Sequence, residues 1–177
     1  SFSDSPRNIV VALNVAVSEG LIFPVGAGYK WIELEVADEA NTKKIDYKVA
    51  HDRIQNAAYS LIPENEMPGI HLRLGRTILA NTPADYLDDE IFEIVNQLNL
   101  GQSLVPNGKE QVELAEMNLR AGKRAKASAA YESSLAHFKT GLNLLGEDIW
   151  QDHYELNLAL FLEAVESAYL TTKFDEM

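Results

Sequence analysis

Hydrophobic residues in the first third of the chain follow two different periods. Over residues 6–19 they recur every three or four positions, which predicts a helix that ends at Gly20. Residues 20–38 are rich in strand-forming side chains and alternate between apolar and polar over 31–36. Residues 45–52 can form the partner strand. The pattern therefore predicts a helix followed by a β-hairpin.

From residue 52 onward the apolar residues recur only at helical spacing. Pro63 follows the first of these helices, Gly101 follows the third, and Gly122 is expected to close the fourth. The connections are short, which predicts antiparallel neighbours. The runs expected to be helical are 52–62, 64–81, 84–101, 108–127, 126–146 and 148–170.

The helices after residue 63 have features of tetratricopeptide helix pairs. Two helix ends, at 119–127 and 169–177, resemble each other in their small and aromatic residues. Their spacing is about fifty residues, against about 34 in the tetratricopeptide repeat. The helices are therefore expected to be tetratricopeptide-like in character but not in repeat length. In the last helix the stripe expected to pack inward is Trp150, Tyr154, Leu158, Phe161, Leu162, Val165 and Tyr169.

These patterns predict a mainly α fold with two parts. Residues 1–62 form a helix, a β-hairpin and a helix, which together make a partial winged helix. Residues 63–177 form an α-helical region of antiparallel, tetratricopeptide-like hairpins. The chain has no initiator Met and opens almost directly on a helix, so we expect it to be a piece of a longer chain.

The charge is acidic and unevenly distributed. The whole chain has a formal net charge of −12. Residues 1–62 contribute −2, from six basic and eight acidic side chains, and residues 63–177 contribute −10, from nine and nineteen. An acidic surface repels phosphate backbones, so nucleic acid is not an expected partner. The acidic helical region is instead expected to bind proteins.

The sequence contains no signal for export or membrane insertion. No apolar run approaches the length of a membrane span, and no signal peptide is present. The chain has no cysteine, so disulfides and thiolate zinc sites do not arise. These observations favour a cytoplasmic location.

No catalytic motif stands out either. The four histidines, His51, His71, His137 and His153, have no metal-binding spacing and are expected to be ordinary core or surface residues. Acids at 88–90 begin a helix and complement its dipole. The basic run 123–126 is expected to pair with nearby acids or to contact an anionic partner surface. We expect no catalytic residue, no metal and no enzymatic activity in this segment.

The pair His51–Asp52 lies where the second strand meets a helix. Asp52 is a suitable N-cap, which is a purely structural role. The pair can instead be a functional site. Both interpretations remain open from the residues alone.

Residues 16–22 (AVSEGLI), and above all residues 47–79 (YKVAHDRIQNAAYSLIPENEMPGIHLRLGRTIL), resemble a block that follows the core of STAND-class (AAA-type) ATPases. The most similar members are large bacterial multi-sensor proteins with serine/threonine kinase and histidine kinase modules. The resemblance continues through the later helices and so covers nearly the whole chain. It implies a winged helix without its first helices, whose uncovered apolar surface favours homodimers.

In that family a Met-His-Asp-type motif places its histidine near the ADP β-phosphate and helps to hold the inactive state. Val49-Ala50-His51-Asp52 matches the His-Asp part, but Ala50 stands where the family has methionine. The resemblance thus implies that His51 and Asp52 sense nucleotide in the parent protein. It implies no cofactor for the segment itself, and ATP or ADP with Mg for the parent.

Two functions follow as predictions. In the first, the segment is a non-catalytic regulator of a multidomain signal-transduction kinase. It couples the nucleotide state of an adjacent ATPase core to a helical protein-interaction region, with the kinase modules of the same chain as further partners. In the alternative, the chain is a free-standing helical scaffold that binds proteins and has no link to nucleotide.

Overall fold

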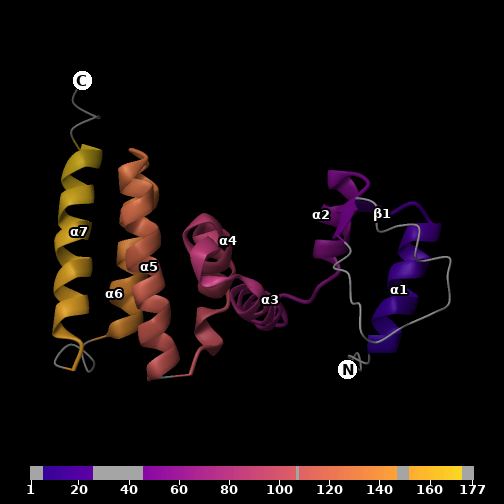
Figure 1. Ribbon diagram of the computed structural model, residues 1–177, viewed down its shortest axis with the longest axis horizontal. Coiled ribbons are helices and arrows are strands. Elements are labelled where there is room, and N and C mark those ends of the chain that lie inside the picture. The colour runs from indigo at the N-terminus through magenta and orange to yellow at the C-terminus, as the bar shows by residue number, and fades with distance from the viewer. Residues whose placement is uncertain (1–5, 26–45, 107, 147–151, 173–177) are drawn as a thin grey trace. The chain divides into compact units, whose positions relative to one another are not determined.

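A computed structural model describes residues 6–25, 46–106, 108–146 and 152–172. They belong to two compact units, Ser1–Pro63 and Glu64–Met177. The described elements are helices apart from one small antiparallel sheet (Figure 1). The prediction of a mainly α fold, with a helix, paired strands and a helix followed by helical hairpins, is confirmed.

The first unit contains a two-stranded sheet between two helices. The strands pair antiparallel, with Ile22 opposite Val49 and Val25 opposite Asp46. The strand expected over 31–36 and the turn after it lie outside the described residues. The elements are α1 (Pro6–Ser18), β1 (Ile22–Val25), β2 (Asp46–Val49) and α2 (Asp52–Ser60).

None of the first unit's described side chains is buried. Among the apolar residues of α1, Leu13 and Val17 are half-buried, whereas Val10 is 55% exposed. Leu61, which directly follows α2, is 83% exposed. Local sequence therefore forms the elements here without enclosing a core among the residues described.

The second unit is a series of helices that pack on their neighbours. Helices α3 and α4 form one hairpin, α5 and α6 a second, and α7 packs on α6 and α5 (Figure 1). The elements are α3 (Met67–Asn81), η2 (Ala84–Tyr86), α4 (Leu87–Leu100), η3 (Gln102–Leu104), α5 (Lys109–Ala127), α6 (Tyr131–Leu145) and α7 (Tyr154–Thr172).

The core of this unit depends on close contact between α5 and α6. Phe138 is completely buried, and a Cβ placed on Gly122 would overlap its ring. The prediction that α5 closes at Gly122 is therefore wrong. This glycine is an interior position where the lack of a side chain lets an aromatic ring approach the backbone.

Helix α5 continues to Ala127 and ends in a Schellman-type turn. Ala129 has the left-handed φ of 59°, and the Ala130 N–H donates to the Ala125 carbonyl at 2.9 Å. Helix α6 consequently begins at Tyr131, and the prediction that it begins near residue 126 is wrong. The left-handed position of this turn is occupied by Ala129 and not by the usual glycine, so the sequence does not indicate that a helix ends there.

The buried side of α7 is also not the predicted one. Phe161 is 50% exposed and Leu162 57%, and Tyr154, Val165 and Tyr169 are similarly exposed. The residues that are buried are Asn157, Leu160, Ala164 and Ser167. Small side chains on this side allow α7 to lie close to α6, where a Cβ on Gly141 would crowd Leu160. Trp150 lies outside the described residues.

Candidate functional site

The predicted pair lies at the junction of β2 and α2. His51 has extended φ and ψ of −157° and 141°, and its Nδ1 accepts a hydrogen bond from the Arg53 N–H at 3.2 Å. The N-cap is thus His51, and the expectation that Asp52 caps the helix is wrong. Asp52 lies in the first turn, where its charge complements the helix dipole.

This cap fixes what the His51 ring can do. An Nδ1 that accepts a hydrogen bond carries no proton, so the proton of the neutral ring is on Nε2. Both His51 and Asp52 are exposed to solvent. The site therefore presents an Nε2–H donor at the start of α2, where the N–H groups of Arg53 and Ile54 are already hydrogen-bonded to His51.

An apolar cavity of about 380 Å³ lies in the same unit. It is bounded by side chains of α1, β1, β2 and α2, including Val49 and Ile54 on either side of the His51 junction. Its lining residues are Ala16, Leu21, Ile22, Val49, Ile54, Gln55, Ala58, Tyr59 and Ile62. This surface can accommodate an apolar side chain better than a charged ligand.

A second cavity, of about 360 Å³, lies in the helical unit between α3, α4 and α5. Leu79, Leu98 and Leu114 contribute apolar walls. At its edge the Arg76 guanidinium donates two hydrogen bonds to the Glu110 carboxylate, at 2.7 and 2.8 Å. The hydrogen bond to Glu110 raises the pKa of Arg76. The ion pair links α3 to α5 at this edge.

A buried polar network that the sequence analysis missed connects α4, α5 and α6. The side-chain amides of Asn99 and Asn118 exchange two hydrogen bonds of 2.9 Å. His137 Nδ1 lies 3.3 Å from the Asn118 Oδ1, and burial lowers the pKa of His137. Asn118 is fully buried and also donates to the Leu114 carbonyl at 2.9 Å. His137 is thus a hydrogen-bonded core residue.

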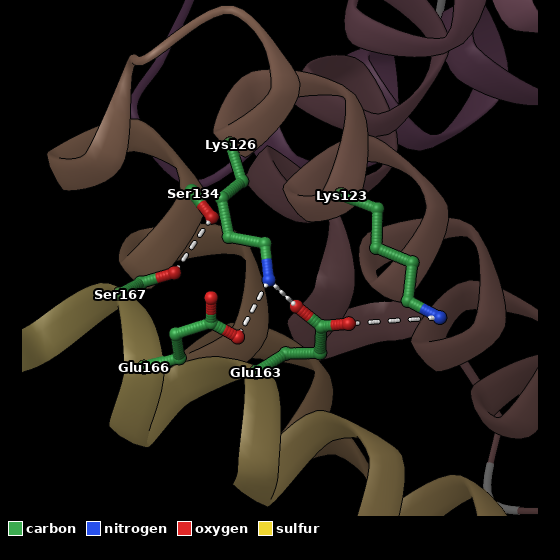
Figure 2. A network of polar contacts seen from close by, with 6 residues as sticks. All are labelled: Lys123, Lys126, Ser134, Glu163, Glu166 and Ser167. Carbon is green, nitrogen blue, oxygen red and sulfur yellow. Dashed lines mark hydrogen bonds and ion pairs between the residues drawn. The ribbon is translucent and has the colours of Figure 1, made fainter. Parts of the chain in front are cut away.

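A charged network joins α5 to α7 (Figure 2). Lys126 Nζ binds the carboxylates of Glu163 and Glu166, the latter at 2.9 Å, and Lys123 lies 3.8 Å from Glu163. The hydrogen bond to Glu163 is the largest cause that raises the pKa of Lys126. Beside it, the hydroxyls of buried Ser134 and Ser167 are 3.0 Å apart.

Pairing with acids accounts for the rest of the basic run. Arg124 binds Asp89 of α4 at 3.0 Å, and one turn earlier Arg120 binds Asp88. The hydrogen bond to Arg120 lowers the pKa of Asp88. The expected pairing with nearby acids is observed, and the acids that begin α4 act as ion-pair partners as well as dipole complements.

Metal-binding clusters and membrane-spanning helices are both absent from the described part of the chain. It contains no group of three or more histidine, cysteine, aspartate or glutamate side chains placed to hold a metal ion. It also contains no helix of the length and apolarity that crossing a bilayer requires. The features of the described residues that could contact a ligand or partner are exposed surfaces, the two cavities and the exposed N–H donor of His51 at the start of α2.

Comparison with known proteins identifies a relative in signal transduction. No family model and no solved structure matches the chain. The chain is similar to hybrid signal transduction histidine kinase G of Dictyostelium discoideum, with 31% identity over 164 residues. The alignment covers 79% of this chain but only 5% of the kinase. The similarity therefore relates the chain to a small segment of a much longer signalling protein.

Proposed function

We propose that this chain is a regulatory segment of a signalling kinase that acts in the cytoplasm and performs no catalysis itself. The observation that carries the proposal is the similarity of most of the chain to part of a signal transduction histidine kinase. The name of the relative mentions neither a bacterial source nor a STAND-class ATPase. Both are implied by the sequence resemblance and are part of the proposal.

Within this proposal the two units have different roles. The first unit, a partial winged helix, contacts an adjacent ATPase core and responds to whether ATP or ADP, with Mg, is bound there. His51 donates its Nε2–H to the nucleotide, and Asp52 supports the helix start. The exposed ring and its cap through Nδ1 support this role. The helical unit transmits the response to proteins and kinase modules.

The test uses the full-length parent protein and measures the rate of ADP release. His51→Ala removes both the ring and the cap, and we expect it to speed ADP release by about tenfold, which corresponds to one hydrogen bond to a charged group. His51→Asn is the matched control because asparagine caps helices well but has no imidazole. Both variants should release ADP faster.

Two results would contradict the nucleotide role. Normal ADP release by His51→Asn would show that only the cap matters. A parent protein without a nucleotide-binding core would remove the relay altogether. The alternative, a helical protein-binding scaffold with no nucleotide link, would then stand. It is favoured by the self-contained core of the second unit.

A further inference from the structure

Helices α5 and α7 bury side chains at partly matching positions. If residue numbers in α5 are increased by 42, four of its seven buried residues fall on buried residues of α7, whereas Val112, Leu114 and Ala121 do not. The two helices therefore share part of their burial pattern. The pairs are Ala115 and Asn157, Asn118 and Leu160, Gly122 and Ala164, and Ala125 and Ser167.

The opposite sides of the two helices differ in chemistry. At positions that α5 exposes to water it carries Glu116, Arg120 and Lys123. The positions 42 residues later are Leu158, Leu162 and Val165, so three charged side chains are replaced by three aliphatic ones. A helix that is apolar on both sides is typical of one packed between two neighbours.

We call Leu158, Phe161, Leu162, Val165 and Tyr169 the outer face of α7. Their spacing of three, one, three and four residues keeps them on one side of the helix over three turns. All except the half-buried Leu158 are at least 50% exposed. In the part of the chain that the structure describes, the main packing neighbours of α7 are α6 and α5, and Phe161, Leu162 and Val165 remain exposed beside them.

The charges of α7 indicate what can bind there. Its charged residues are Glu155, Glu163 and Glu166, and it has no lysine or arginine. Glu163 and Glu166 are already paired with lysines of α5, so Glu155 is the carboxylate that would decide between partners. A second copy of α7 would offer Glu155 no base, because α7 has none. A helix with basic residues beside its apolar stripe would instead gain favourable contacts with Glu155, which has no ion pair within the described residues.

We propose that the outer face of α7 binds an amphipathic α-helix of a partner protein, one whose apolar stripe is flanked by lysine or arginine. The partner helix packs on α7 as α7 packs on α6. This proposal rests on the protein-interaction role given to the helical region above and names the surface responsible. It does not depend on nucleotide sensing by His51, so the two can fail separately.

The experiment measures binding of labelled peptides to the whole chain by fluorescence anisotropy. The probe is a designed amphipathic helix of about three heptads, with leucine at its a and d positions and lysine at e and g. The matched control peptide carries glutamate in place of lysine. We expect the basic peptide to bind at least tenfold more tightly, and added salt to narrow the difference.

The variant Leu162→Arg/Val165→Lys gives α7 the side chains that α5 has at the equivalent positions. Because both residues are exposed, the thermal midpoint should stay unchanged, while affinity for the basic peptide should fall at least tenfold. Leu100→Arg is the control, since Leu100 is 58% exposed on α4 and lies away from this face. It should bind as the unaltered protein does.

Several outcomes would overturn the proposal. They are no binding of the basic peptide, equal binding of the acidic peptide, or unaltered binding by Leu162→Arg/Val165→Lys. Sedimentation can also show a dimer of the unaltered chain that the same double substitution abolishes. That result would identify a second copy as the occupant of the outer face and would reject the proposed partner helix. If nucleotide coupling in the parent protein is normal, each of these outcomes rejects only the binding surface on α7. The rest of the proposed function then stands.

Discussion

The two units of this chain differ in where their apolar side chains lie. In the helical unit twelve side chains, among them Phe138, Leu114 and Leu160, form one buried cluster. In the first unit no described residue is buried, and Ile9, Val11 and Phe23 are each more than half exposed. Both sequences are apolar enough to form elements, but only one arrangement removes those residues from water. Element formation and core formation are thus separate consequences of the pattern.

Substitution of one aromatic residue in each unit should show this difference most strongly. Phe138→Ala removes a fully buried ring and leaves a cavity, so we expect the free energy of unfolding to fall by about 3–5 kcal/mol. Phe23→Ala, at a site 53% exposed, should change it by less than about 1 kcal/mol. Urea unfolding followed by circular dichroism measures both. Equal losses would contradict the contrast.

A smaller effect is expected from the charged network between α5 and α7. The side chains of Lys126 and Glu163 are 22% and 20% exposed, whereas those of Lys109 and Glu113 are 91% and 50% exposed. A double-mutant cycle on the first pair should give a coupling of about 1–2 kcal/mol, between exposed and buried ion pairs. The second pair should give less than about 0.5 kcal/mol. Similar couplings would mean that burial does not strengthen the first pair.

The smallest expected effect is a pH dependence due to His137. Burial lowers its pKa from the usual 6.5, so the unfolded chain binds a proton that the folded chain refuses. The contribution of neutral His137 to the free energy of unfolding is fully present above pH 6.5 and is lost as the pH falls below it. The free energy of unfolding then falls by at most about 1.4 kcal/mol per pH unit for this reason. His137→Gln should reduce the slope of unfolding free energy between pH 6.5 and 5. An unchanged slope would mean that groups other than His137 cause the pH dependence of the unfolding free energy.

The sequence predicted elements better than faces and ends. Pro63 and Gly101 follow helices as expected, because each breaks a helix by local chemistry. Gly122 was misassigned because a glycine can end a helix or admit a neighbour, and only contact with Phe138 distinguishes the two. On α7, periodicity selected the largest apolar residues, whereas close packing on α6 selected Ala164 and Ser167.

The junction of strand and helix at His51 and Asp52 was predictable in position, but the residue that caps the helix was not. Residues 51 and 52 both have side chains that can cap, and the backbone of β2 decides that His51 does so. The Asn99–Asn118 pair had no signal, because two amides on different helices share no spacing rule. The nucleotide role of His51 and Asp52 stays a prediction from the resemblance.

Hydrogen exchange on the whole chain tests most directly the claim that, among the residues described, only those of the helical unit enclose a core. Backbone amides in α4 to α7 should exchange slowly, with protection that approaches the global free energy of unfolding. Amides in α1, β1, β2 and α2 should exchange at least a hundredfold faster, since no described side chain of that unit is buried. Equal protection in the two units would contradict this account.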